Sequence, residues 1–151
     1  MAGRINYKLN DNIMGHIKKA ILPILLTGIW LNISGTIRWI FLIEPYWIEK
    51  YKNMNLVLPS ELINNITWMI WGFMFAIMIF IISRKFDLIQ STLLSWFAAY
   101  AMMWVIIWNV GVLPTEMLWI NIPLSLFDAF VGALICKKIS KNMKTLESLL
   151  L

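Results

Sequence analysis

The sequence predicts an all-α integral membrane protein, a four-helix bundle in which consecutive helices cross the bilayer up, down, up and down. Two observations lead to this prediction. Apolar residues make up 60% of the 151 residues, more than the roughly 45–50% of ordinary soluble domains. They gather in four runs, each long enough to cross a hydrocarbon core that requires about 20 helical residues. The expected spans cover residues 20–43, 62–82, 88–113 and 117–136.

The continuity of these runs separates helices from the strands of a membrane barrel. Lipid offers no hydrogen-bond partners, so a spanning backbone must be a helix or part of a closed barrel. Barrel strands are about 10 residues long and alternate apolar with polar side chains. We therefore expect one helical transmembrane domain at 20–136, preceded by a basic segment, 1–19, and followed by a basic tail, 137–151.

Basic side chains gather at one end of the expected bundle. Ten flank the spans on this side: Arg4, Lys8, Lys18, Lys19, Arg84, Lys85, Lys137, Lys138, Lys141 and Lys144. The other side has two lysines and four glutamates: Lys50, Lys52, Glu44, Glu49, Glu61 and Glu116. Because cytoplasmic loops are enriched in Lys and Arg, both termini are predicted to be cytoplasmic. The basic side then faces anionic lipid head groups, which explains the positive charge without a nucleic-acid partner.

The first span is expected to be an uncleaved anchor, since its apolar run is too long for a signal peptide. Pro23 lies in its opening turn, where proline costs little. The connection at 44–60 begins Glu44-Pro45-Tyr46-Trp47, and aromatic rings of this kind favour the depth of the head groups. We expect this connection to lie on the membrane surface as a short helix or re-entrant cap. Frequent Ile, Asn and Lys suggest an AT-rich genome and favour a bacterial plasma membrane.

Short links join the last three spans, and such links favour antiparallel neighbours. The sequence VLPSE at 57–61 is echoed by VLPTE at 112–116. One interpretation is a two-plus-two duplication of the kind found in some transporters. The interpretation we favour is that both segments solve the same local problem. Each ends the preceding helical element, supplies a Ser or Thr cap for the following helix and places an acid in the first turn of that helix.

Span four contains the polar residues with the most functional potential. Asp128 lies near its middle, where an aspartate costs about 2.5–3.5 kcal/mol. Asn121, Ser125 and Asp128 fall at positions i, i+4 and i+7 and so share one face of a helix. Polar residues on one stripe are typical of a close contact between membrane helices. Asp128 is therefore either a structural hydrogen-bonding group or a site for a proton, an ion or a substrate.

The expected partners of Asp128 lie in span one. Asn32 has a similar depth and shares a stripe with Gly28 and Gly35, which would allow span four to approach closely. Arg38 lies six residues farther along, on a different face. Two alternatives remain open for Arg38: an ion pair with Asp128, or extension to the external surface, alone or paired with an external glutamate.

Span three has aromatic residues at every fourth position: Trp96, Tyr100, Trp104 and Trp108. One interpretation is that this stripe lines an aromatic cavity for an apolar or cationic ligand. The other is that the rings are packing residues, with the end members in the interfacial belts.

The sequence contains one histidine and one cysteine, His16 and Cys136. This inventory excludes bis-histidine haem ligation, a His/Cys zinc cluster within the spans and a Ser–His–Asp triad in the bilayer. No cofactor, metal or enzymatic activity is expected.

Three functions remain as hypotheses. The first is a non-catalytic protein that stabilises or assembles with other membrane components through a polar seam between spans one and four. The second is a small oligomeric transporter or channel, with Asp128 as the coupling or substrate-binding carboxylate. The third and weakest is a lipid-binding or lipid-modifying protein that uses the external connection. The expected partners are anionic lipids and either a second copy of the chain or another membrane protein.

Overall fold

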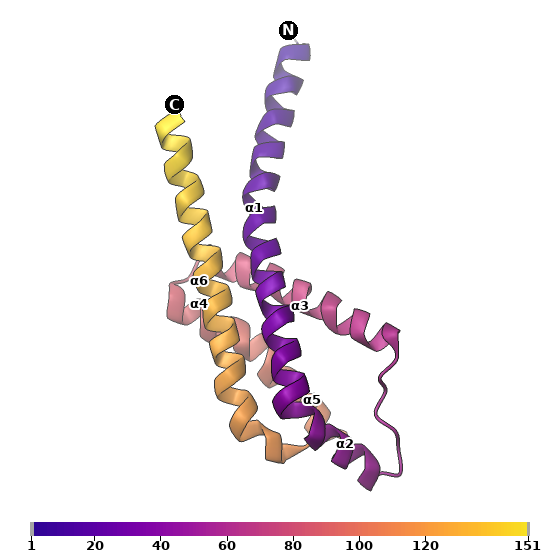
Figure 1. Cartoon of the computed structure of the whole chain (residues 1–151). Helices are drawn as coiled ribbons and strands as arrows, with labels where there is room; N and C mark the ends of the chain where they lie inside the picture. Colours follow the sequence, from indigo (N-terminus) through magenta and orange to yellow (C-terminus); the bar gives the residue numbers. More distant parts are fainter. Residues whose placement is uncertain (1, 151) are drawn as a thin grey trace.

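The computed structural model describes the backbone of residues 2–150 and the side chains of residues 20–142. Every regular element in this part of the chain is helical (Figure 1). Four helical runs are long and apolar enough to cross a membrane: Ala20–Asn53, Leu62–Ser83, Leu88–Asn109 and Thr115–Asn142. The all-helical class and the four candidate membrane spans are therefore confirmed.

The first run is longer than predicted, because the helix does not stop at the polar boundary after residue 43. Helix α1 (Ala2–Arg38) passes into a π-helical turn, η1 (Trp39–Ile43), and continues as α2 (Glu44–Asn53). The chain then turns at Asn55, which has a φ of 56°, and runs without regular structure through 56–60. A short helix is therefore present in this connection as α2, continuous with the first span, and its predicted position on the membrane surface stays a prediction.

Helix α3 (Leu62–Ser83) and helix α4 (Leu88–Trp96) form a hairpin with a tight turn. A capping box begins α4. The Asp87 carboxylate accepts a hydrogen bond from the Gln90 backbone N–H at 2.8 Å, and the Gln90 side chain accepts from the Asp87 backbone N–H at 3.4 Å. This reciprocal pair satisfies two donors that a helix start leaves free.

Lys137 of the last helix binds the C-terminal end of α3. Its Nζ donates to the carbonyl oxygens of Ser83, at 3.0 Å, and Phe86, at 2.5 Å. A cation at a helix C-terminus satisfies free carbonyls and interacts favourably with the helix dipole. The α3–α4 turn is thereby held against the side of the last helix.

The third run contains a second π-helical turn. Helix α4 leads into η2 (Phe97–Ala101), which leads into α5 (Met102–Asn109). The expected span, 88–113, extends beyond the end of α5 at Asn109. Gly111 has a φ of 78°, a left-handed conformation that glycine adopts readily and that commonly terminates helices.

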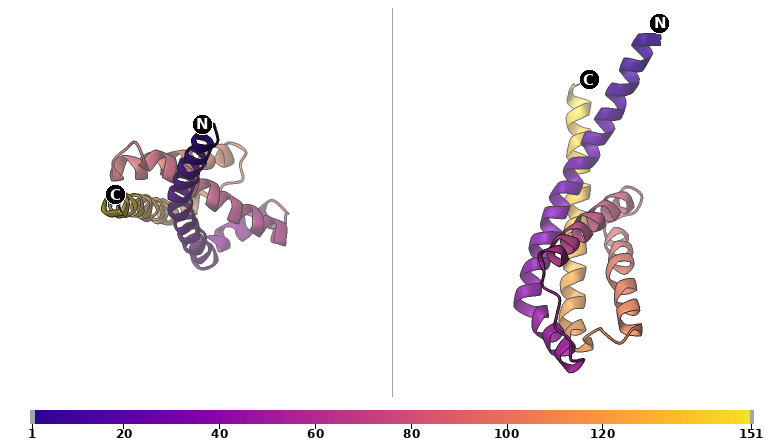
Figure 2. Two further views of the ribbon diagram at one scale, coloured as in Figure 1. Left: turned by 90° about the horizontal axis from the view of Figure 1, so that it is seen from above. Right: turned by 90° about the vertical axis from the view of Figure 1, so that its right-hand side faces the viewer.

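The last run begins with a 3₁₀ turn, η3 (Thr115–Met117), followed by helix α6 (Leu118–Leu150). Helix α6 continues beyond residue 136, where the sequence predicted the span to end. Figures 1 and 2 show α1 and α6 side by side, with their free ends projecting in the same direction, while α3 crosses α1 at a steep angle.

Small residues allow the close approach of α1, α3 and α6. Ala76, Ala129 and Ala133 are fully buried. A Cβ atom on Gly132 would lie 3.0 Å from Ile79 Cδ1 and 3.1 Å from Thr27 Cγ2, two atoms of neighbouring helices. Close backbone contact through small residues is how helices pack where lipid removes the hydrophobic driving force.

Candidate functional site

Asp128 and Arg38 form a buried ion pair between α6 and α1. Arg38 Nη1 lies 2.7 Å from Asp128 Oδ2, and the Asp128 and Arg38 side chains are 3% and 11% exposed. The Ser34 hydroxyl donates a hydrogen bond to Asp128 Oδ1. Ser34 and Arg38 are four residues apart, so they project from the same face of α1. Helix α1 therefore presents a hydroxyl and a guanidinium to one carboxylate.

Tyr100 of η2 joins the third run to this pair. Arg38 Nη2 donates to the Tyr100 hydroxyl at 3.1 Å, and the guanidinium carbon lies 5.5 Å from the centre of the Tyr100 ring. The ring is held by α3, with centroids 5.3 Å from Trp71 and 5.5 Å from Phe75. We call Ser34, Arg38, Tyr100 and Asp128 the buried polar cluster. All four helical runs contribute to it or pack directly on it.

The buried polar cluster lies near the middle of the candidate spans. Asp128 is near the centre of Thr115–Asn142, Arg38 near the centre of Ala20–Asn53, and Tyr100 near the centre of Leu88–Asn109. An isolated charge at this depth is costly, about 2.5–3.5 kcal/mol for either Asp or Arg. Pairing opposite charges lowers this cost, and residues of this kind in membrane proteins usually face one another inside the bundle.

Among the described side chains, Arg38 and Asp128 have neutral partners in Tyr100 and Ser34 but form an ion pair only with each other. Within the described residues, Arg38 Nη1 and Asp128 Oδ2 form no directed hydrogen bond, so each of these two atoms depends on their 2.7 Å charge contact. Removing one partner of a buried pair leaves an uncompensated charge and is strongly destabilising. The pair is therefore a point at which the packing of α1 against α6 is specified.

Both residues of the Arg38–Tyr100 hydrogen bond stand at a π-helical turn. Turn η1 begins immediately after Arg38, and Tyr100 lies within η2. A π turn makes hydrogen bonds one residue longer than those of an α-helix, and such turns occur frequently at functional sites. The two turns change the register of the helices on either side of the buried polar cluster.

Asn121 and Ser125 lie beside the cluster but do not join it. Trp96 Nε1 of α4 donates to Ser125 Oγ at 2.8 Å, and Ser125 Oγ donates to the Ile122 carbonyl at 3.0 Å. Asn121 is 7% exposed, and its Oδ1 has no hydrogen-bond partner within the described residues. The predicted stripe is thus divided, since Asp128 turns toward α1 whereas Ser125 contacts α4.

Asn32 is not the partner of Asp128, and this expectation was wrong. Its Nδ2 donates to the Gly28 carbonyl at 2.8 Å. Its carboxamide lies against Gly72 of α3, where an added Cβ would be 2.6 Å from Nδ2. A Cβ on Gly28 would meet the Phe73 ring at 2.3 Å. Gly28 and Asn32 of the stripe expected to face span four therefore pack against α3, whereas a Cβ on Gly35 would have no neighbour within 4 Å.

A different face of α1 contacts α6. Besides Ser34 and Arg38, it contains Thr27, whose hydroxyl lies 3.2 Å from Cys136 Sγ. Trp30 Nε1 also donates to the Asp128 carbonyl at 3.3 Å. Sequence reasoning missed Ser34 as a partner, although its spacing four residues before Arg38 was a usable signal.

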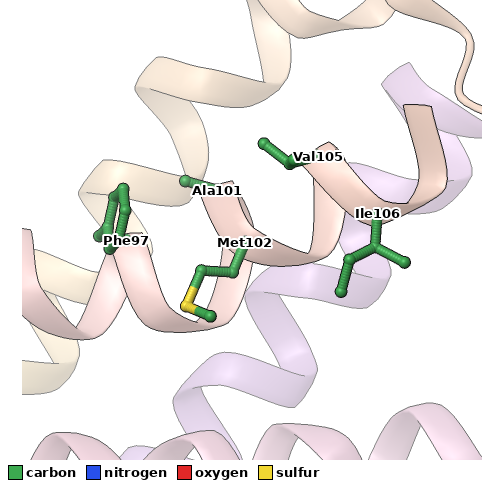
Figure 3. A pocket seen from close by; sticks show the side chains of 5 residues that line it. All are labelled: Phe97, Ala101, Met102, Val105 and Ile106. Atoms are coloured by element: carbon green, nitrogen blue, oxygen red, sulfur yellow. The ribbon is translucent and has the colours of Figure 1, made fainter. Parts of the chain in front are cut away.

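The aromatic stripe of the third run packs as a cluster of rings. The Trp96 and Trp104 centroids are 6.0 Å apart, and those of Tyr100 and Trp104 are 5.6 Å apart. Trp108 is exposed. An apolar hollow on this run lies instead on its outer side, lined by Phe97, Ala101, Met102, Val105 and Ile106 (Figure 3). Of the two interpretations of the stripe, the ring contacts fit packing, and the ligand cavity stays a prediction.

Among the described side chains, no three His, Cys, Asp or Glu residues are grouped so as to hold a metal ion. Comparison of the chain with protein-family models, curated proteins and solved structures gives no match. The geometry of the buried polar cluster is therefore the basis for a functional proposal.

Proposed function

We propose that this chain is a small, non-catalytic membrane protein that stabilises or assembles with other membrane components. In this proposal the buried polar cluster fixes the four helices as one body. The observation that carries it is the 2.7 Å contact between Arg38 and Asp128. Each charge is matched by the other, and Ser34 and Tyr100 bond the remaining sides. Interhelical polar contacts of this kind hold membrane bundles together.

The proposed membrane is a bacterial plasma membrane, with both termini in the cytoplasm. The excess of Lys and Arg beside the termini and in the α3–α4 turn supports this orientation. The same residues would lie at the level of anionic lipid head groups, each contributing about 1 kcal/mol of attraction. This basic rim gives the proposed protein its lipid partner.

Accessibility of engineered cysteines tests the orientation. In a Cys136→Ala background, the exposed positions Lys52 and Lys138 are replaced by cysteine one at a time. A membrane-impermeant maleimide should label Lys52→Cys in intact cells and Lys138→Cys only after the membrane is opened. Labelling of Lys138→Cys from outside would reverse the proposed topology.

A second candidate function is a small transporter with Asp128 as the coupling carboxylate. The two π-helical turns beside Arg38 and Tyr100 favour it, because such turns occur frequently at functional sites. An acidic residue in a span also commonly marks a proton or ion path.

Proton flux separates the two functions. Purified protein is reconstituted into vesicles that enclose a pH-sensitive dye, and a pH gradient is imposed. The assembly proposal expects wild-type and Asp128→Asn vesicles to keep the gradient as long as protein-free vesicles. A transporter would dissipate the gradient in the wild type and lose this ability in Asp128→Asn, but not in the control Glu116→Gln at an exposed site. That result would overturn the assembly proposal.

A further inference from the structure

The α3–α4 turn lies beside α6 at one end of the candidate spans and contains positive charge (Figure 1). Arg84 and Lys85 lie in this turn, between the candidate span that ends at Ser83 and the one that begins at Leu88. Lys137 of α6 reaches the turn, where its Nζ binds two backbone carbonyl oxygens. Three cations from two elements therefore lie together where a span would leave the hydrocarbon.

Two of these cations are held in place without an anion. A lysine ammonium has three N–H donors. Two donors of Lys137 bind the carbonyl oxygens at 3.0 and 2.5 Å, and the third has no acceptor among the described residues. The Arg84 guanidinium carbon lies 5.8 Å from the centre of the Phe80 ring. Because both side chains are already positioned, binding an anion costs less side-chain entropy here than at an unrestrained lysine.

The charge of this group is not balanced by nearby acids. The sequence has two basic residues in 80–91 and three in 130–142, but Asp87 is the one acid in these two ranges. The Asp87 carboxylate already accepts the Gln90 backbone N–H at 2.8 Å. Arg84, Lys85 and Lys137 form no ion pair with any residue in the described part of the chain. The counter-charge therefore comes from outside this part of the molecule.

Exposed aliphatic side chains lie on the hydrocarbon side of the cations. Ile81 precedes Arg84 by three residues, and Leu134 precedes Lys137 by three, so each lies about one helical turn nearer to the middle of the spans on the same face. Ile81 and Leu134 are 59% and 41% exposed. The acyl chains of a lipid would cover these side chains, whereas a soluble phosphate would not touch them. The arrangement therefore favours a phospholipid over free phosphate.

We propose that Arg84, Lys85 and Lys137 bind the phosphate of an anionic phospholipid in the leaflet on the side of the termini. Arg84 offers its planar fork to two phosphate oxygens, and Lys137 offers its third N–H, in charge-assisted hydrogen bonds. Lys85 adds a third positive charge, which favours a head group with net negative charge over a zwitterionic one. This inference rests on the lipid partner proposed for the basic rim and narrows it to one site.

Lipid titration of the full chain in a non-ionic detergent tests the site. The probe is dioctanoyl phosphatidylglycerol, and native mass spectrometry measures the number of bound lipids and their dissociation constant. Saturable binding of one lipid per chain is expected, with binding of dioctanoyl phosphatidylcholine and of glycerol 3-phosphate weaker by about tenfold or more. Equal binding of phosphatidylcholine would exclude recognition of the negative charge. Equal binding of glycerol 3-phosphate would exclude a role for the acyl chains, and either result would overturn the inference.

Single substitutions distinguish this site from a diffuse attraction to the basic rim. Arg84→Gln should raise the dissociation constant of phosphatidylglycerol about tenfold, because a bidentate charged contact is lost. Arg84→Lys keeps the charge but not the fork and should raise it about threefold. Lys19→Gln removes the same charge next to the first candidate span and should change the constant by less than about twofold. Equal effects of Lys19→Gln and Arg84→Gln would overturn the inference, and Lys85→Gln replaces Arg84→Gln in this comparison if the latter does not fold.

Failure of the lipid site and failure of the proposed function give different results. Loss of selective lipid binding, with the vesicle pH gradient retained and Lys138→Cys labelled only after the membrane is opened, would refute the site alone. A protein that dissipates the gradient through Asp128 but binds phosphatidylglycerol selectively would refute the assembly proposal and support the site.

Discussion

Removing one member of the Arg38–Asp128 pair should destabilise the bundle more than removing both. Either Asp128→Leu or Arg38→Met leaves the opposite charge buried, and breaking such a pair costs about 3–5 kcal/mol. Asp128→Leu should fall at the lower end of this range. Arg38 keeps its 3.1 Å hydrogen bond to Tyr100 and its position 5.5 Å from the ring centre.

The double variant Arg38→Met/Asp128→Leu removes both charges. Replacing a whole buried pair by apolar side chains is often neutral or stabilising. The Tyr100 hydroxyl then loses its partner, at a cost of about 1–3 kcal/mol. We therefore expect the double variant to lie within about 3 kcal/mol of the wild type and the coupling energy to be at least about 3 kcal/mol.

Unfolding in mixed micelles of increasing denaturing-detergent content measures these free energies, with tryptophan fluorescence as the signal. The chain has nine tryptophans, and Trp30 bonds the Asp128 carbonyl at 3.3 Å, so the signal reports on the site. Glu116→Gln, at an exposed position, is the matched control and should change stability by less than about 0.5 kcal/mol. Single variants that each lose under 1 kcal/mol, or a double variant that loses the sum of both, would refute the reasoning.

Three further predictions concern contacts around the site. Tyr100→Phe removes the acceptor of one Arg38 hydrogen bond and should lower the free energy of unfolding by about 1.5–3 kcal/mol in the same assay; no change would mean that the bond contributes nothing. Lys137→Met should cost about 1 kcal/mol and speed amide exchange in the α3–α4 turn, whereas unchanged exchange would argue against the cap. Deleting Ala99 in η2 should be tolerated, because a π turn accommodates about one residue more than an α turn. Deleting Ile77 in regular α3 rotates the rest of that helix by about 100° and should prevent folding; equal tolerance of both deletions, judged by detergent-stable yield, would contradict this.

For the polar residues of the spans, the sequence predicted burial correctly but only part of the contacts. A mid-span aspartate predicts a sheltered position because its exposure to lipid is costly, and Asp128 is buried. An ion pair with Arg38 was one of the alternatives, and it is the one that the structure contains. The choice of Asn32 as partner was wrong, because Gly28 and Gly72 accommodate Phe73 and Asn32 and turn that stripe toward α3.

In the third helical run, too, the sequence identified a group of residues but not the contacts that they make. The spacing of four residues grouped Tyr100 with three tryptophans as an aromatic packing residue. It could not show that the Tyr100 hydroxyl accepts a hydrogen bond. Tyr100 became part of the buried polar cluster through the Arg38 guanidinium, 62 positions earlier in the sequence. The π turn that contains Tyr100 could not be predicted from the hydropathy of the sequence. An apolar segment can form a π turn or an α turn in lipid with the same residues.

The sequence by itself determined the helical class, the four runs long and apolar enough to cross a membrane and the asymmetry of charge, because the requirement to satisfy a backbone in lipid acts on each segment separately. Only the tertiary structure decided which face of α1 meets α6, which residue neutralises Asp128 and where the helices change register. These choices depend on steric fit between side chains that are distant in sequence, and no local periodicity encodes that fit.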